Sequence, residues 1–187
     1  MEVYNGRPAD CSGREECEVR TYDLLDELEI SYSRVDHEEL MTMEGCREID
    51  GLMKAPACKN LFLCNRQKTQ FYLLMMPGEK PFKTKDLSHG LGIARLSFAG
   101  EEYMEKFLGL RPGSVSVMGL MNDQENRVQL IIDRDVAAQE YVTCHPCRNT
   151  STISLATEDL LEKFLPAVHH TPVMVDLPDH SGEEAAK

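Results

Sequence analysis

Two apolar runs joined by a short polar turn are the feature that most constrains the fold. Residues 60–65 (NLFLCN) and 70–77 (QFYLLMMP) are rich in aliphatic and aromatic side chains, and the polar stretch RQKT separates them. Runs of this length and composition, bounded by a polar turn, are typical of neighbouring β-strands. The sequence therefore predicts a domain built around a β-sheet.

Further strands and helices are indicated along the chain. ISYSRVDH at 30–37 alternates apolar and polar residues like a half-buried strand, and RVQLIID at 127–133 follows a polar NDQEN turn. Strands are also expected at 114–121 and on both sides of the CHPC stretch at 144–147. Residues 37–56 show no clear element, and GLMKAP at 51–56 indicates a loop. Helices are expected within 18–29, 83–92, 100–110 and 157–168, with Thr21 and Thr157 as candidate caps.

Strands outnumber helices, and many are joined by short turns, which favours antiparallel pairs around one sheet. The 187 residues suffice for one domain with a sizeable core. We therefore expect a single mixed α/β (α+β) domain over residues 17–171, with a flexible lead-in at 1–16 and a flexible tail at 172–187.

The charge of the chain is distributed unevenly. The net charge is -12, but residues 51–100 carry eight basic and two acidic side chains, a net +6, which could mark an anion-binding surface or a solvated lysine face. No apolar run is long enough for a membrane span, and the polar, acidic first residues do not resemble a signal peptide. Seven cysteines without a disulfide-like spacing favour a reducing, cytoplasmic setting.

The CHPC stretch allows three interpretations. A structural zinc site needs about four ligands, and Cys58 and Cys64 have a poor spacing for the second pair. A redox pair normally begins a helix, whereas the flanks here favour strand and loop. The third interpretation is a loop with two buried thiols, in which His145 and Asn149 either orient a substrate or are satisfied locally.

Two other segments carry candidate binding groups. Lys59 precedes the first apolar strand, where its ammonium could meet an anion such as a phosphate or lie along the surface. Residues 111–123 (RPGSVSVMGLMND) join a tight turn to small residues that let a ligand approach the backbone closely. No nucleophilic triad, Walker A loop, dinucleotide-binding fingerprint or HExxH motif is present.

Together and in this order, KNLFL, the QFYLLMM strand, PGSVSVMGLMND, RVQLIID and HPCRNT resemble segments of the YbaK-type aminoacyl-tRNA deacylases. Within them the chain is similar to the free-standing prolyl-tRNA editing proteins (the ProX group), over about residues 18–170. The resemblance implies a strongly curved, partly barrel-like mixed sheet flanked by helices. It also implies hydrolysis of the ester between a wrong amino acid and a tRNA 3′ end, with alanine on tRNA(Pro) as the target.

The resemblance also implies a set of site residues. Lys59 and His145 match the residues with catalytic roles, although their individual roles are left open. The residues expected to bind substrate are Asn60, Ser114, Ser116, Gly119 and Asn149. Where the family has Pro-Phe, this chain has Val117-Met118, a departure expected at the pocket wall. The family needs no cysteine at 144 or 147, and neither a metal nor another cofactor is expected.

An aminoacyl ester is already activated, so a positioned water can cleave it without a covalent nucleophile. Lys59 is expected to hold the phosphate or ribose of the terminal adenosine, while backbone groups near Gly119 and the 145–149 loop orient the water and the carbonyl. A small pocket would admit alanine and exclude proline. The expected partners are the acceptor end of tRNA(Pro) and prolyl-tRNA synthetase, with no membrane. The alternatives are a non-catalytic tRNA- or synthetase-binding module, and a thiol-redox or zinc protein.

Overall fold

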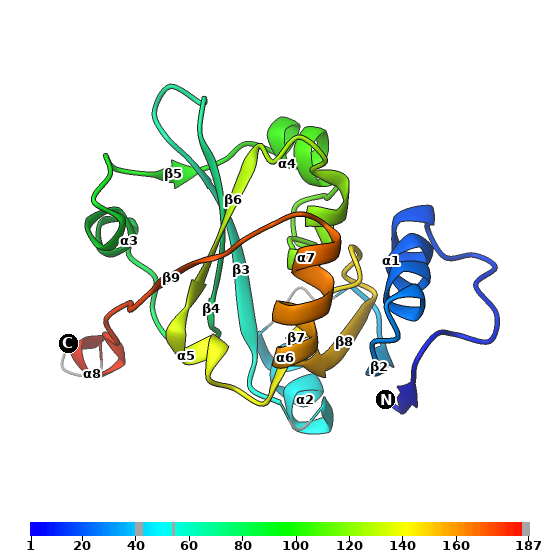
Figure 1. Ribbon diagram of the computed structural model, residues 1–187. Helices are drawn as coiled ribbons and strands as arrows, with labels where there is room; N and C mark the ends of the chain where they lie inside the picture. The colour runs from blue at the N-terminus through cyan, green and yellow to red at the C-terminus, as the bar shows by residue number, and fades with distance from the viewer. Residues whose placement is uncertain (40–42, 54, 185–187) are drawn as a thin grey trace.

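The computed structural model describes residues 1–39, 43–53 and 55–184 (Figure 1). Over these residues the strands form two sheets rather than the single sheet predicted. The four-stranded antiparallel sheet has the order β1 (Val3–Asn5), β2 (Tyr32–Asp36), β8 (Ser151–Ala156), β7 (Tyr141–Cys144). The five-stranded mixed sheet has the order β5 (Ser97–Phe98), β3 (Cys58–Cys64), β4 (Phe71–Pro77), β6 (Val128–Asp133), β9 (Val173–Val175). The predicted mixed α/β class is confirmed.

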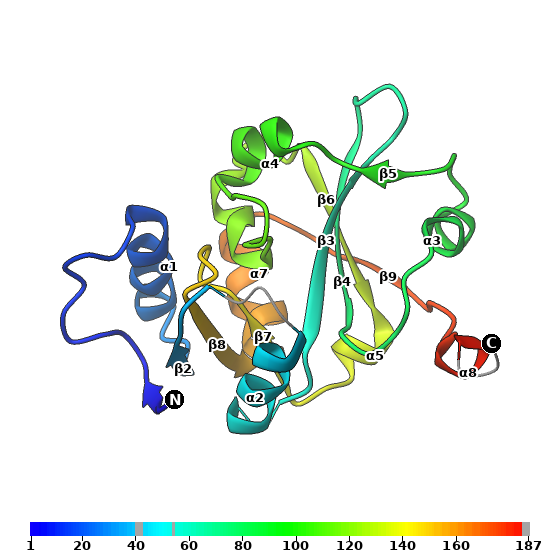
Figure 2. The same ribbon diagram turned by 180° about the vertical axis from the view of Figure 1, so that it is seen from behind.

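Helices cover both sheets. The longer ones are α1 (Glu16–Glu27), α2 (Met43–Met53), α3 (Thr84–Leu91) and α4 (Glu101–Leu108), and the short ones are α5 (Arg134–Ala137) and α8 (Ser181–Glu184). A continuous helical segment is formed by α6 (Thr157–Asp159), a π-helical turn (Leu160–Phe164) and α7 (Leu165–Ala167). Figures 1 and 2 show α3 and α8 on one side of the five-stranded sheet and α4 and α7 on the other.

The main hydrophobic core fills the space between the two sheets. Because side chains alternate along a strand, Phe62 of β3 and Leu73 of β4 face this core, and the four-stranded sheet contributes Ile153. The opposite face of the five-stranded sheet carries Leu63, which packs in a second cluster with Leu87 of α3. The second half of β3 therefore lies between two packed layers, with its side chains alternating between them, while the first four residues of the strand are only partly buried.

Most of the predicted elements are confirmed. The apolar runs form β3 and β4, which pair antiparallel from Cys58 opposite Pro77 to Cys64 opposite Phe71. Strands also form at 128–133 and on both sides of the CHPC stretch. Helices α3 and α4 end where glycines were expected, because Gly92 and Gly109 adopt the left-handed conformation of a helix C-cap.

Two segments differ from their predictions. Residues 43–53 form α2, whose Ile49 and Met53 pack on Val35 of β2, although this region has many charged residues and GLMKAP was predicted to be a loop. Residues 51–53 are the last turn of that helix, and residue 54 lies outside the described residues. The strand predicted at 114–121 is instead a 3-10 helix at Val117–Asn122, because the Ser116 hydroxyl caps it by accepting from the Met118 N–H.

Both candidate helix caps are wrong. Thr21 lies inside α1, where its hydroxyl donates to the Cys17 carbonyl one turn earlier at 2.9 Å. Ala156 is the residue at the cap position of α6, while the Thr157 N–H donates to the Glu140 carbonyl at 3.0 Å. That bond extends the β7–β8 pairing by one residue, so the strand runs directly into the helix.

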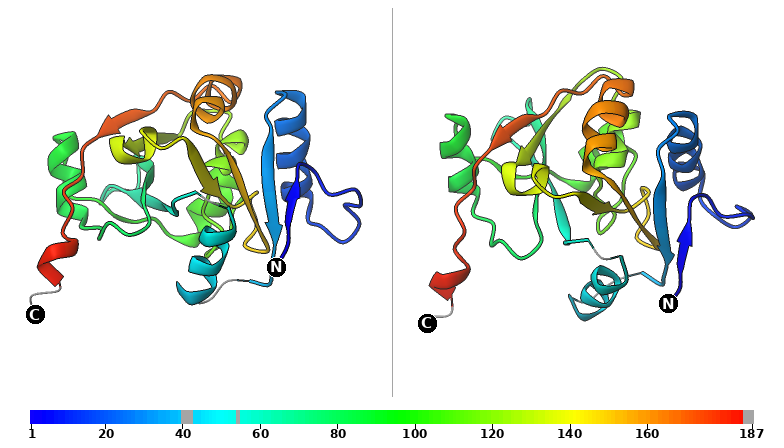
Figure 3. Two further views of the ribbon diagram at one scale, coloured as in Figure 1. Left: turned by 90° about the horizontal axis from the view of Figure 1, so that it is seen from below. Right: turned by 60° about the horizontal axis from the view of Figure 1, so that its bottom comes forward.

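β1, near the start of the chain, and α8, near its end, lie far apart, as Figure 3 shows. β1 pairs with β2 and β9 pairs with β6, so each of the segments predicted to be flexible contains a paired strand. The boundaries at residues 17 and 171 stay predictions, and residues 185–187 lie outside the described residues. None of the described helices has both the length and the apolar character that crossing a membrane requires.

Candidate active site

A cavity of about 600 Å³ lies at the start of β3. Its wall combines α2, the first residues of β3, the turn after β4, the loop at 113–115 and the ends of β7 and β8. Lys59, Asn60 and His145 line it, so the structure brings three of the predicted site residues together from segments 85 residues apart in the chain.

Lys59 is a half-buried cation at the start of β3. It has no hydrogen bond or ion pair to any part of the chain that the structure describes. Burial lowers the pKa of its ammonium. β5 pairs with Leu63 and Cys64 alone, so the start of β3 has an edge without a strand beside it among the described residues. A desolvated, unpaired ammonium at this position favours binding of an anion.

His145 is held as a neutral acceptor. Its Nδ1 lies 2.9 Å from the Ser151 carbonyl oxygen, which can only accept, so Nδ1 carries the proton and Nε2 keeps a lone pair. Burial lowers the pKa of His145, and the nearby His37 lowers it further, outweighing the bond to Ser151. At neutral pH the imidazole is therefore uncharged and able to accept a hydrogen bond from a water.

Asn60 and Ser116 position the cavity wall. The Asn60 side-chain oxygen accepts from the Val117 N–H at 3.0 Å, which ties β3 to the segment after residue 113. The fully buried Ser116 hydroxyl donates to the His145 carbonyl at 2.6 Å. These two bonds fix the Lys59 and His145 segments relative to each other.

Ser114 and Asn149 lie behind this wall. The Asn149 N–H donates to the Ser114 hydroxyl at 3.2 Å, and Ser114 is itself buried. Neither residue lines the cavity. The structure thus places both beside the site, where they join the 113–115 loop to the 145–149 loop.

Gly119 lies farther from the cavity, within the 3-10 helix. A Cβ added there would come within 2.7 Å of Leu110 Cδ1, so the residue is small because a neighbour packs against it. Val117 and Met118, which replace the family's Pro-Phe, are fully buried in the main core. This departure from the family pattern lies in the core and not in the cavity lining, to which the nearby, partly buried Val115 contributes.

Acidic residues that the sequence pattern did not single out also line the cavity. Asp50 comes from α2 and Glu79 from the turn after β4. Burial raises the pKa of Asp50, and the charge of Glu79 raises it further. Nothing local in the sequence marks these residues, because α2 itself was not predicted and each carboxylate lies on a different element.

The thiols of the CHPC stretch are poor metal ligands and nucleophiles. Burial raises the pKa of Cys144, and it raises that of Cys147 to about 12, so both stay protonated at neutral pH. Residues 145–150 form bends and a turn, without the helix N-terminus that a redox pair uses. The described residues contain no group of three or more histidine, cysteine, aspartate or glutamate side chains placed to hold a metal.

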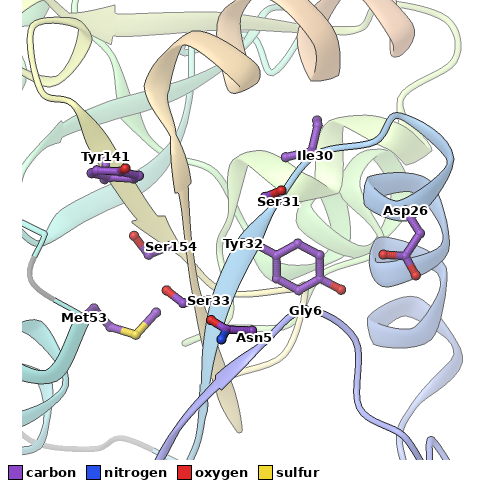
Figure 4. A pocket seen from close by; sticks show the side chains of 10 residues that line it. All are labelled: Asn5, Gly6, Asp26, Ile30, Ser31, Tyr32, Ser33, Met53, Tyr141 and Ser154. Atoms are coloured by element: carbon purple, nitrogen blue, oxygen red, sulfur yellow. The ribbon is translucent and has the colours of Figure 1, made fainter.

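A larger hollow of about 760 Å³ lies elsewhere on the four-stranded sheet (Figure 4). Its side chains include Tyr32, Ser33 and Ser154, and it contains no lysine, arginine or histidine. Its one carboxylate is the exposed Asp26, and without a cation it offers no site for the phosphate of a nucleotide. The smaller cavity at Lys59 and His145 is therefore the candidate active site.

The chain is similar to known proteins over most of its length. The family model of the aminoacyl-tRNA editing domain matches residues 37–163, a range that includes Lys59, Asn60 and His145. The chain is 34% identical over 153 residues to the prolyl-tRNA editing protein ProX of Acetoanaerobium sticklandii, covering 82% of this chain and 93% of that one. It is 30% identical over 155 residues to prolyl-tRNA synthetase associated domain-containing protein 1 of Danio rerio, covering 82% and 83%.

The fold is also found among solved structures. A crystal structure described as a trans-editing enzyme for prolyl tRNA synthetase superposes with a TM-score of 0.64, covering 88% of this chain and 99% of that one. At 13% sequence identity this likeness supports the fold alone.

Proposed function

The chain belongs to the family of aminoacyl-tRNA editing domains, and on this premise we propose that it deacylates mischarged tRNA(Pro), with alanine as the amino acid removed. The named relatives support the prolyl-tRNA part of this proposal, since one is a prolyl-tRNA editing protein and another a prolyl-tRNA synthetase associated protein. Alanine is the amino acid that the resemblance to the ProX group implies, and its small size is consistent with it.

One observation carries the proposal: a single cavity combines an unpaired lysine with a neutral histidine. An aminoacyl-tRNA end presents a phosphate, a ribose and an ester within a few bonds of each other. Lys59 supplies a positive charge for the phosphate, and His145 supplies an acceptor for a water proton. No covalent nucleophile is needed, because the ester is activated and the water is held beside it.

In this mechanism His145 Nε2 accepts a hydrogen bond from the attacking water and orients its lone pair toward the ester carbonyl. The Nδ1 bond to Ser151 fixes the ring and its tautomer, while Ser116 holds the His145 backbone. Lys59 keeps the terminal nucleotide in register so that the ester lies next to that water. When the acyl C–O bond breaks, the esterified ribose oxygen leaves and takes up one proton of the water to become a free hydroxyl, while the water oxygen stays on the released amino acid as part of its carboxyl group.

The charges of the cavity suit both ends of such a substrate. The α-ammonium of an aminoacyl ester is positive, and Asp50 and Glu79 place carboxylates on the cavity wall. Lys59 lies on β3, where it can meet the negative phosphate. Arg47 of α2 lines the same cavity, so its wall carries both signs of charge: the carboxylates can meet the α-ammonium, and Lys59 can meet the phosphate.

Selection against proline follows from size. A synthetase site shaped for proline rejects the smaller alanine weakly, since each missing methylene is worth about 1–3 kcal/mol. A second and narrower site can exclude proline by steric overlap while alanine enters. This division of labour requires access to the tRNA acceptor end, either in complex with prolyl-tRNA synthetase or after release from it.

The test is to incubate the purified protein with Ala-tRNA(Pro) and Pro-tRNA(Pro) and follow the loss of each ester. We expect rapid loss of the alanyl ester and persistence of the prolyl ester. Equal loss of both, or loss of neither, contradicts the proposal. Binding of tRNA without hydrolysis supports instead a non-catalytic binding module on the same fold.

A further inference from the structure

A second hollow, of about 650 Å³, lies on the α3 side of β3. It is formed where α3, the residues just before it and β5 approach β3, all on the same side in Figure 1. We call it the basic groove. It is lined by four cations, Lys59, Lys83, Lys85 and Arg95, and by two phenylalanines, Phe82 and Phe98.

The basic groove is rich in positive charge. Among the described residues that line it there is no carboxylate. Asp86 of α3, the one acidic residue in the sequence between Glu79 and Glu101, accepts a hydrogen bond from His180 at 2.8 Å. Four cations in one hollow of a chain with a net charge of -12 form a surface suited to a polyanion.

Phe98 adds an aromatic surface to this charge. It is the most exposed large hydrophobic side chain among the described residues, at 62%. It packs edge-to-face against Phe82, with ring centroids 6.1 Å apart and an interplanar angle of 72°. The Phe82 contact orients the exposed ring, so its open face can stack with a planar ligand.

Lys59 connects the two hollows. It lines both the basic groove and the candidate active site, because it lies on the unpaired edge at the start of β3. A ligand whose end occupies the cavity can therefore continue past Lys59 into the basic groove without crossing another element. Regularly spaced negative charges and planar rings are the chemistry of a nucleic-acid single strand.

We propose that the basic groove binds the single-stranded nucleotides that precede the terminal adenosine of the substrate. Their phosphates meet Lys85 and Arg95, and one base stacks on Phe98. Lys59 then contacts the phosphate at the boundary between the groove and the cavity. This inference rests on the proposed function, since it assigns the path of the same RNA strand.

The direct test measures binding without catalysis. The probe is a 5′-labelled RNA hexanucleotide that ends in CCA with a free 3′ hydroxyl, and fluorescence anisotropy gives its Kd at several salt concentrations. We expect Phe98→Ala and Arg95→Glu each to weaken binding about tenfold, because base stacking and phosphate contacts are lost. Arg95→Glu should also reduce the dependence of the Kd on salt.

Arg66→Glu is the matched control for charge. Arg66 is exposed in the β3–β4 turn, about 23 Å from Lys59 along the strand, and the substitution changes the net charge by the same amount. We expect its Kd to stay within about twofold of wild type. If the groove variants bind like wild type, or if Arg66→Glu weakens binding as much as Arg95→Glu, the proposal is overturned.

Hydrolysis separates this inference from the proposed function. The rate on Ala-tRNA(Pro) is compared with the rate on an alanyl ester of adenosine 5′-monophosphate, which lacks the preceding nucleotides. Phe98→Ala should lower the first rate more than the second, and an equal fall in both contradicts the groove assignment. If wild type binds the hexanucleotide through the groove but cleaves neither ester, the proposed function fails while the groove assignment stands.

Discussion

Two lysines emerge at the same end of the β3–β4 hairpin and have opposite environments. Lys80, three residues after β4, is 6% exposed and donates to Asp133, Asp135 and the Leu177 carbonyl, each at 2.8 Å. Burial opposes its charge, but the bonds to the two aspartates outweigh burial and raise its pKa. Lys59 has no such partner, and burial alone lowers its pKa.

The difference in surroundings gives the two lysines different roles: Lys80 stabilises the fold, and Lys59 is available to bind a ligand. Lys80 links the end of β4 to β6 and to the chain after β9. Its ammonium is paired with two carboxylates of the same chain. Lys59 is left for a ligand at the boundary of two hollows. Both are lysines in the same basic segment, so charge counting alone cannot distinguish them.

The largest expected effect is the loss of folding stability on substitution of Lys80. Lys80→Ala leaves the buried Asp133 carboxylate without its ion pair, and we expect the free energy of unfolding to fall by about 3–5 kcal/mol. Chemical denaturation measures this. Lys85→Ala, at an exposed position, is the control and should change stability by less than about 0.5 kcal/mol. If the two variants are equally stable, the ion pairs of Lys80 do not stabilise the fold.

The next largest expected effect is the loss of deacylation rate on substitution of Lys59. We expect Lys59→Ala to lower the deacylation rate on Ala-tRNA(Pro) at least about 100-fold, as does loss of one essential charged or hydrogen-bonding contact in other active sites. Its thermal unfolding should match wild type, because no internal bond is lost. Lys59→Arg keeps the charge and should restore part of the rate. If the alanine variant has wild-type activity, Lys59 does not take part in the reaction.

Ser116→Ala should affect both properties. The substitution removes the hydroxyl that donates to His145 and caps Met118, leaving buried polar groups without a partner at a cost of about 1–3 kcal/mol. We expect lower stability together with a lower rate, in contrast to Lys59→Ala. Ser97→Ala, on exposed β5, is the control and should change neither. An unchanged rate for Ser116→Ala means that the bond does not position His145.

The pH dependence of stability tests the state of His145. Its folded pKa lies below the unfolded value near 6.5, so the unfolded chain binds more protons as the pH falls. The contribution of neutral His145 to the free energy of unfolding is fully present above about pH 6.5, and it is lost as the pH falls through the folded pKa. Thermal unfolding from pH 7.5 to 5 should show a smaller decrease for His145→Gln than for wild type. Identical curves indicate that His145 does not contribute.

The smallest expected effect is on the cysteines. The double variant Cys144→Ser/Cys147→Ser should deacylate Ala-tRNA(Pro) within about twofold of wild type, because neither thiol is ionised at neutral pH. The rate is measured at a temperature at which circular dichroism reports a folded variant. Loss of activity in the folded variant returns the thiol-redox and zinc interpretations to consideration.

The sequence predicted the parts of the fold that depend on local patterns. The apolar runs of β3 and β4 and the glycine ends of α3 and α4 are local signals, and the structure confirms them. Residues 117–122 look like a strand, but Asn60 and Ser116 bond to the N–H groups of Val117 and Met118, and the segment becomes a 3-10 helix. The bond from Asn60 joins positions 57 residues apart, which no local pattern reveals.

The candidate site was predictable in a similar way. Lys59 and His145 belong to short motifs in a fixed order, and the structure places both at one cavity. Asp50 and Glu79 were not found because their approach depends on how α2 packs on the four-stranded sheet. The groove residues Phe82 and Phe98 were also missed, since their shared surface forms only when β5 pairs with β3.

The unpaired edge at the start of β3 has a further consequence, for self-association. An open strand edge exposes backbone N–H and C=O groups that can pair with a strand of another molecule, and a charged side chain at such an edge opposes this. Lys59 occupies that position. We therefore expect Lys59 to contribute to keeping concentrated protein monodisperse, apart from any role toward a substrate.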